Sequence, residues 1–180
     1  MSKAVLISIH PRWCEKIASG EKTIEIRKTR PKLQPPFKCY IYCTMEHPYI
    51  SVSCGELDKL NYRTNTVGRC NGKVIGEFVC DTYVTDKTFG HDALFNAAAC
   101  MNESYVVAYS AGSPIYGWHI SNLKIYDTPR ELGELRQACS NSFYCESCAM
   151  YRENDGTCGN ESLQIKRAPQ SWCYVEDAPE

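Results

Sequence analysis

A change of hydrophobic period at Gly20 constrains the fold of this chain most. Residues 11–19 before it have the spacing of a short amphipathic helix, and Gly20 stands where a glycine commonly ends one. After Gly20 the period becomes two, so Ile24 and Ile26 point to one side of a strand. The opposite side carries a hydroxyl, a carboxylate and a guanidinium, from Thr23, Glu25 and Arg27. The sequence therefore predicts a strand with a candidate site on its polar face and Lys22 at the mouth of that site.

This polar face has two interpretations. Arg27 offers a planar fork suited to a phosphate or a base edge, and Lys22 offers a point charge. Glu25 could accept a hydrogen bond from an exocyclic amine, as carboxylates do with cytosine N4. Alternatively, the strand is an ordinary amphipathic one, with a Glu–Arg ion pair and solvated lysines that contribute little. Spacing alone leaves both interpretations open.

The rest of the chain predicts strands that often follow one another directly. Strands are expected over residues 4–9, 23–28, 37–44, 73–83, 116–126, 162–166 and 171–175. Helices are expected over residues 11–19 and about 92–109, with one or two helical turns at 129–135 and a long loop at 45–71. Five to seven strands with two or three helices favour the α+β class, built on a curled sheet or small β-barrel with peripheral helices.

Charge excludes a strong general attraction to nucleic acid or membrane, because the net charge is −1. Positive charge is instead local: five cations and one acid lie between residues 22 and 32. No apolar run approaches the roughly 20 residues that span a bilayer, and the N-terminus lacks the pattern of a signal peptide. We therefore expect a cytoplasmic protein without a membrane partner.

Twelve cysteines in such a protein are expected to be metal ligands or buried thiols rather than disulfides. Four of them lie within twenty residues and include one Cys-x2-Cys pair, which is typical of a tetrahedral zinc site. These predicted ligands of a structural Zn²⁺ are Cys139, Cys145, Cys148 and Cys158, with Cys173 as a substitute for Cys139. Free thiols or a redox pair are the alternatives.

The zinc prediction also divides the chain. Residues 136–161 are expected to form a zinc-knuckle-like insertion in a domain made of residues 1–135 and 162–180. Five other thiols are expected to be buried packing groups: those of Cys14, Cys39, Cys43, Cys80 and Cys100. The sequence assigns no role to Cys54 and Cys70.

Four segments in this order resemble the ASCH domain of the PUA-like superfamily. They are Gly20-x-Lys22-Thr23-x-Glu25-x-Arg27 and residues 72–78, 116–120 and 169–175, the last resembling phage and bacterial ASCH proteins. The resemblance covers residues 3–127 and 162–177. It implies a small PUA-like barrel with a cleft that binds RNA or a nucleotide. The residues expected to line this cleft are Lys22, Thr23, Glu25, Arg27 and Lys28, with Trp172 as an exposed stacking surface brought out by the preceding loop.

Two further functions stay open beside RNA or nucleotide binding. Some ASCH proteins are enzymes, and one type removes the acetyl group of N4-acetylcytidine with a lysine, a threonine and a glutamate. In this chain the lysine corresponds to Lys22, Glu25 stands at the threonine position, and Glu103 is the acid nearest the glutamate position. An amidohydrolase or ribonuclease would use Lys22 to stabilise an oxyanion and Glu25 as general base. A protein-interaction adaptor centred on the zinc segment is the other alternative.

Overall fold

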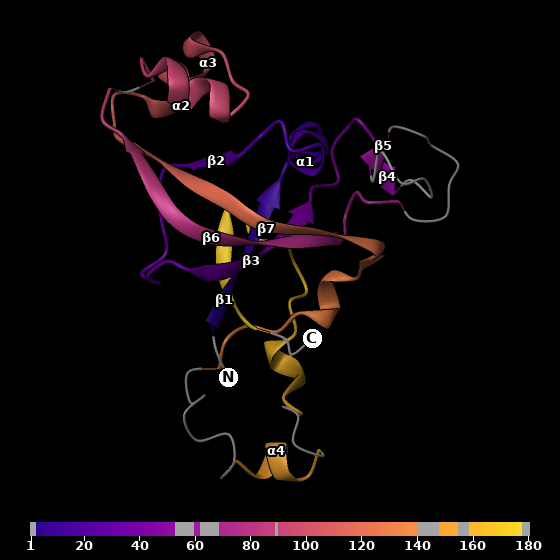
Figure 1. Cartoon of the computed structure of the whole chain (residues 1–180). Helices are drawn as coiled ribbons and strands as arrows, with labels where there is room; N and C mark the ends of the chain where they lie inside the picture. Colours follow the sequence, from indigo (N-terminus) through magenta and orange to yellow (C-terminus); the bar gives the residue numbers. More distant parts are fainter. Residues whose placement is uncertain are drawn as a thin grey trace.

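A bent mixed sheet with helices at its margins forms the body of the protein (Figure 1). The computed structural model describes residues 3–52, 60–61, 69–88, 90–139, 148–154 and 159–177. The main strands are β1 Lys3–Ile9, β2 Ile24–Arg27, β3 Phe37–Cys43, β6 Val74–Asp86, β7 Ile115–Arg130 and β8 Trp172–Glu176. The helices are α1 Pro11–Ala18, α2 Ala93–Ala98, α3 Glu103–Ser110 and α4 Ala149–Arg152. The α+β class is confirmed.

The strands follow the order β2-β7-β6-β3-β1-β8. β1 and β3 are parallel, and the other neighbours are antiparallel. The β6–β7 ladder is interrupted by three register shifts. Such irregularities bend strands and increase their twist, which brings the two margins of the sheet toward each other.

Side chains join these two margins where backbone ladders do not. Arg27 Nη2, from β2, donates to the carbonyl oxygen of Ser8 in β1 at 2.6 Å. Trp172 Nε1, from β8, donates to Thr29 Oγ1 at 3.1 Å. Among the described strands the sheet is therefore open in its hydrogen bonding but curled, with β1 and β8 facing the segment around β2.

The helix–glycine–strand unit forms as expected. His10 caps α1, Pro11 occupies its first turn, and Gly20 follows it with φ +79°. Ile24 and Ile26 are buried in a cluster with residues of α2 and α3. Gly117 in β7 makes this contact possible, because a Cβ atom there would collide with Ile24 and the ring of Phe95.

Three expected elements differ from the structure. The single helix predicted over residues 92–109 is two helices, α2 and α3, because Cys100 adopts φ +54° and Asn102 caps a new helix. The loop predicted over residues 45–71 contains a two-stranded sheet, β4 Ser51–Val52 with β5 Leu60–Asn61. The strand predicted over residues 162–166 begins instead as a 3-10 helix, Glu161–Leu163.

Short backbone contacts connect the chain on the two sides of the predicted insertion. Gln137 N donates to Leu163 O at 2.7 Å, and Ile165 N donates to Leu135 O at 3.0 Å. A second 3-10 helix, Leu132–Glu134, precedes them where helical turns were expected. The segment between these contacts contains α4, which lies away from the sheet in Figure 1. In the described part of the chain, no helix has both the length and the apolar character needed to cross a membrane.

Candidate functional site

Three of the predicted site residues meet in a buried cluster beside β2. Arg27 Nη1 lies 2.7 Å from Glu25 Oε1, and Lys22 Nζ lies 3.4 Å from Glu25 Oε2. The side chains of Lys22, Glu25 and Arg27 are 0%, 3% and 13% exposed. A carboxylate at this depth needs both cations, because an unpaired buried charge is strongly destabilising. The ion pair is therefore neither a solvated pair nor a surface feature.

Lys22 lies inside the protein rather than at the mouth of the site. Its Nζ donates to Ala99 O, at the end of α2, at 2.8 Å and lies 5.2 Å from the centre of the Trp13 ring. Burial lowers the pKa of Lys22, and the Glu25 carboxylate opposes that shift. Lys22 thus connects α1, α2 and β2 behind the carboxylate.

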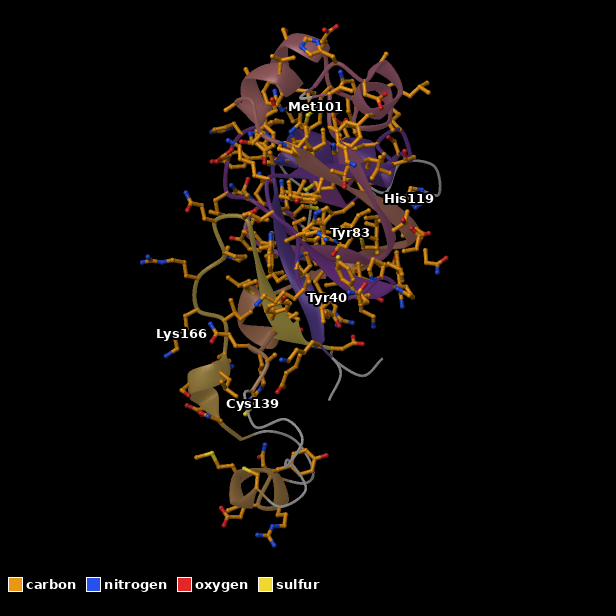
Figure 2. The ribbon with its side chains drawn as sticks, turned by 90° about the vertical axis from the view of Figure 1, so that its left-hand side faces the viewer. Tyr40, Tyr83, Met101, His119, Cys139 and Lys166 are labelled. Atoms are coloured by element: carbon orange, nitrogen blue, oxygen red, sulfur yellow. The ribbon has the colours of Figure 1, made fainter. Side chains whose placement is uncertain are left out.

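A cavity of about 210 Å³ opens in front of the Glu25–Arg27 pair. Three aromatic side chains line it: Trp13 from α1 and Tyr105 and Tyr109 from α3. Met101 also lines it and marks this end of the molecule in Figure 2. The remaining lining residues are Ser8, His10, Ile26, Thr44 and Glu46. The cavity therefore combines stacking surfaces with a charged floor.

Three polar atoms of cavity-lining residues lack a hydrogen-bond partner in the described structure. They are Glu25 Oε2, Arg27 Nε and Thr44 Oγ1, all buried. Glu25 Oε2 has only its 3.4 Å ion pair with Lys22. A buried donor or acceptor left unpaired costs about 1–3 kcal/mol, so a side-chain movement that brings these atoms into contact with a polar ligand would be favourable.

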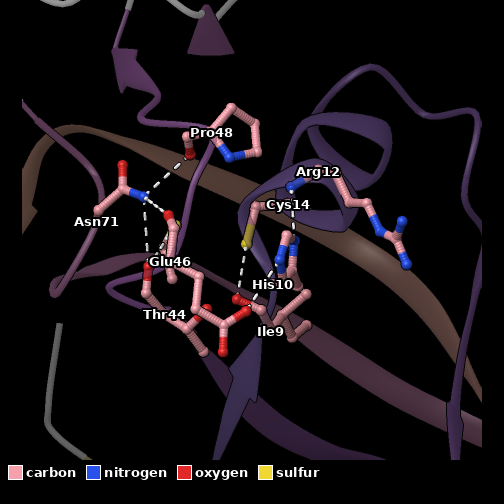
Figure 3. Close-up of polar contacts among 9 residues, drawn as sticks. Ile9, His10, Arg12, Cys14, Thr44, Glu46, Pro48 and Asn71 are labelled. Atoms are coloured by element: carbon pink, nitrogen blue, oxygen red, sulfur yellow. Dashed lines mark hydrogen bonds and ion pairs between the residues drawn. The ribbon is translucent and has the colours of Figure 1, made fainter.

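His10 and Glu46 form the rim of the cavity. His10 Nε2 lies 2.9 Å from Glu46 Oε2, and His10 Nδ1 accepts a 3.4 Å bond from Arg12 N (Figure 3). Burial lowers the pKa of His10, and the Glu46 carboxylate opposes that shift. The His10 side chain is therefore occupied as a helix cap and a rim contact.

Asn71 fixes the loop that follows β3. Its Nδ2 lies 2.7 Å from Glu46 O, 3.1 Å from Pro48 O and 3.4 Å from Thr44 O (Figure 3). Its Oδ1 accepts from Ile50 N at 2.8 Å. Because Thr44 and Glu46 line the cavity, this one buried amide positions part of the cavity wall.

The other predicted cleft residues lie elsewhere. Thr23 and Lys28 are exposed, and Lys28 Nζ stands 5.1 Å from the centre of the Tyr109 ring, outside the cavity lining. Trp172 packs against Trp118 and Tyr174 at the junction of the sheet margins. It therefore contributes to closing the sheet, and the stacking rings of the cavity come from other residues.

Two of those rings were not predicted from the sequence. Tyr105 and Tyr109 are four residues apart, a spacing that places them on one face of α3. That spacing was the available signal, but only the fold shows that this face meets the β2 strand. Glu103, the acid compared with a catalytic glutamate, is exposed and lies 2.6 Å from His91 Nδ1. It is not among the residues that line the cavity.

The zinc prediction falls partly outside the described residues. Cys145 and Cys158 lie there, while Cys139 and Cys148 are described and are free cysteines. Within the described ranges, no group of three or more metal-ligating side chains is close enough to hold a metal ion. The four-thiolate site stays a prediction from spacing.

Comparisons with known proteins agree with this fold. The profile of the ASCH domain family matches residues 7–89, which include Lys22, Glu25 and Arg27. A crystal structure of ASCH from Zymomonas mobilis is 18% identical, with a TM-score of 0.52, covering 96% of this chain and 87% of that one. A tyrosine-to-phenylalanine variant of that protein is 17% identical, with a TM-score of 0.53 and coverages of 97% and 91%.

A serine-to-alanine variant of the same protein is 16% identical, with a TM-score of 0.52 and coverages of 96% and 88%. Identities this low establish a shared fold and no more. No curated protein sequence matches the chain. Residues 7–89 of this chain therefore match the ASCH domain family, and the chain shares the fold of ASCH proteins of known structure.

Proposed function

We propose that this chain binds RNA or a nucleotide, with one base inserted into the cavity in front of the Glu25–Arg27 pair. ASCH domains generally bind RNA. One observation carries the proposal for this site: the rings of Trp13, Tyr105 and Tyr109 line the same cavity as three residues whose buried polar atoms lack a partner within the described part of the chain. A base satisfies both, because it presents a flat face and a hydrogen-bonding edge.

The dimensions and chemistry of the cavity favour a single base. Sites for drug-sized ligands occupy about 300–1,000 Å³, whereas this cavity holds about 210 Å³. Glu25 Oε2 accepts, and Arg27 Nε donates. Cytosine, adenine and guanine each place an amino group beside an acceptor and match this pair. Uracil has no amino group and matches it less well.

Phosphate contacts would come from cations near the cavity rather than from net charge. Arg12, Lys28 and Arg30 are exposed, and each lies against a tyrosine ring. Each phosphate contact to a single strand lowers the slope of log affinity against log salt by about 0.7. We therefore expect binding to weaken with salt, but less steeply than for a strongly basic protein.

Replacing Tyr105 by alanine tests the cavity without disturbing the core. Tyr105 is 44% exposed on α3, so Tyr105→Ala should fold. Losing one stacking partner should weaken the affinity for RNA or for a nucleoside monophosphate about 5- to 150-fold, because a base–aromatic stack contributes about 1–3 kcal/mol. Fluorescence anisotropy or calorimetry measures the change.

The matched control is Lys166→Ala, since Lys166 is exposed and lies far from Met101 in Figure 2. This variant should bind like the unmodified chain. Equal affinity of Tyr105→Ala and the unmodified chain would show that the ligand does not bind in the cavity.

A hydrolase is the second candidate, and the position of the Glu25 carboxylate in the cavity lining is the observation that favours it. A carboxylate facing a cavity can accept a proton from water. Lys22, however, lies behind Glu25 and is bonded to Ala99 O, so it is not placed to meet a substrate carbonyl. Turnover of N4-acetylcytidine or single-stranded RNA that Glu25→Gln abolishes would favour the hydrolase. Binding without turnover would favour a binding domain.

We also propose a structural zinc ion held by Cys139, Cys145, Cys148 and Cys158, supported by their spacing. Elemental analysis of the purified full chain should find about one zinc per chain. Cys148→Ser should lower that content, whereas serine at the buried Cys14 should not, provided that this variant folds. Well under half an equivalent of zinc in freshly purified protein would contradict this proposal.

A further inference from the structure

We propose that a second base-stacking position adjoins the cavity, formed by His47, Tyr49 and Arg69, so that the ligand is a single-stranded RNA and not only a free nucleotide. This inference rests on the proposed function, because it assigns the nucleotide next to the one in the cavity.

The three side chains, referred to as the stack, form a cluster of planar groups in which the two rings are tilted against each other. The ring centres of His47 and Tyr49 are 4.1 Å apart, with an angle of 51° between the rings. The Arg69 guanidinium carbon lies 3.8 Å from the centre of the Tyr49 ring. His47 and Arg69 are exposed, and Tyr49 is half-buried. The stack therefore presents planar, cationic or ionisable groups to solvent.

This stack is held in a fixed position relative to the cavity. His47 follows Glu46, which lines the cavity. Asn71 bonds the carbonyls of both Glu46 and Pro48, on either side of His47 (Figure 3). The segment that carries Arg69 is fixed as well, because Cys70 N donates to Ile50 O at 2.9 Å and Asn71 follows directly. One buried amide thus positions a cavity wall and the stack together.

The chemistry of the stack suits single-stranded RNA. Guanidinium planes and aromatic rings are the groups on which unpaired bases stack, and an arginine also contacts phosphate. The neighbouring Glu46 carboxylate, which contacts His10 at 2.9 Å, would repel phosphate, so we expect bases rather than phosphates on the stack. The contact between Arg69 and Tyr49 has a structural value of only about 0.5–1 kcal/mol at an exposed site. The loop does not depend on it, because Asn71 makes four hydrogen bonds to the loop.

The test compares two ligands and two positions. The probes are a nucleoside monophosphate and an oligoribonucleotide of about eight nucleotides, within the usual range of single-strand site sizes. Arg69→Ala should weaken oligonucleotide binding about 5- to 150-fold and leave binding of the monophosphate unchanged. Arg69→Lys keeps the positive charge but loses the planar guanidinium. Its affinity for the oligonucleotide should lie between those of Arg69→Ala and the unmodified chain. Arg167→Ala, at another exposed arginine, should change neither affinity.

The outcomes separate this inference from the proposed function. If Arg69→Ala leaves oligonucleotide affinity unchanged, or weakens both ligands equally, the second position is wrong. The cavity still stands in that case, provided that Tyr105→Ala weakens both ligands. If Tyr105→Ala weakens neither, or if neither ligand binds the unmodified chain, the proposed function fails and this inference fails with it. Thermal melting of each variant confirms that it is folded.

Discussion

Replacing Lys22 by methionine is expected to lower the free energy of unfolding by about 3–5 kcal/mol, the usual effect of removing one partner from a buried charge pair. The change leaves the Glu25 carboxylate, 3% exposed, with Arg27 alone. It also removes the hydrogen bond to Ala99 O, which holds the end of α2 against β2. Chemical denaturation monitored by circular dichroism measures the loss.

Lys28→Met is the matched control, because Lys28 is an exposed lysine that directly follows β2. Its contact with Tyr109 is a surface cation–π pair, so the expected change is below about 1 kcal/mol. A similarly small effect of Lys22→Met would contradict the structural role assigned to Lys22. A large effect would mean that lost activity in a Lys22 variant is no evidence of catalysis by this residue.

Raising the pH above about 9 is expected to destabilise the fold steeply. Burial raises the pKa of Cys70 and of Cys80 from 9.0 to about 12, and raises the pKa values of Cys14 and Cys39 well above 9.0. In the unfolded chain these thiols lose their protons from about pH 9, while the folded chain keeps them. Their contribution is therefore fully present below pH 9 and disappears as the pH rises toward the folded pKa values.

The expected slope is large compared with the total stability. Each thiol removes about 1.4 kcal/mol per pH unit, so four remove on the order of 5 kcal/mol per unit, against a typical total of about 5–15 kcal/mol. Lys22 acts in the opposite direction, because burial lowers its pKa from 10.5, but it is one group against four. Denaturation in reducing buffer from pH 8 to 11 measures the slope.

Cys80→Ala should make the slope of stability against pH shallower by about 1.4 kcal/mol per pH unit, the contribution of one thiol. Cys148→Ala, at an exposed cysteine, should keep the full slope. Constant stability between pH 9 and 11 would mean that these thiols are solvated.

The two faces of the β2 strand were predicted more accurately than the elements that pack against them. Period-two spacing placed Glu25 and Arg27 on one face and Ile24 and Ile26 on the other, and the structure has them so. Spacing alone did not show that the face is buried, because α2 and α3 lie about seventy residues further along the chain. The burial of Lys22 follows from that packing.

Residues brought together by the topology were the hardest to predict. Asn71 was part of a turn signal, and its hydrogen bonds to residues 44–50 depend on the pairing of β3 with β6. Trp172 was expected to be an exposed stacking surface, but the curl of the sheet places it against Trp118. The burial of Cys14, Cys39, Cys43 and Cys80 was predicted correctly, whereas Cys100 is only partly buried. Composition predicts the burial of a thiol more readily than it predicts long-range contacts.

Photo-crosslinking tests the central claim, that a base enters the cavity in front of Glu25 and Arg27, most directly. RNA carrying a photoreactive base is irradiated on the full chain, and mass spectrometry identifies the residues attached to it. Crosslinks are expected at the cavity rings, Trp13, Tyr105 and Tyr109, and should disappear when an excess of unlabelled RNA competes. Crosslinks that spare all three rings and fall instead on residues 148–154 would contradict it.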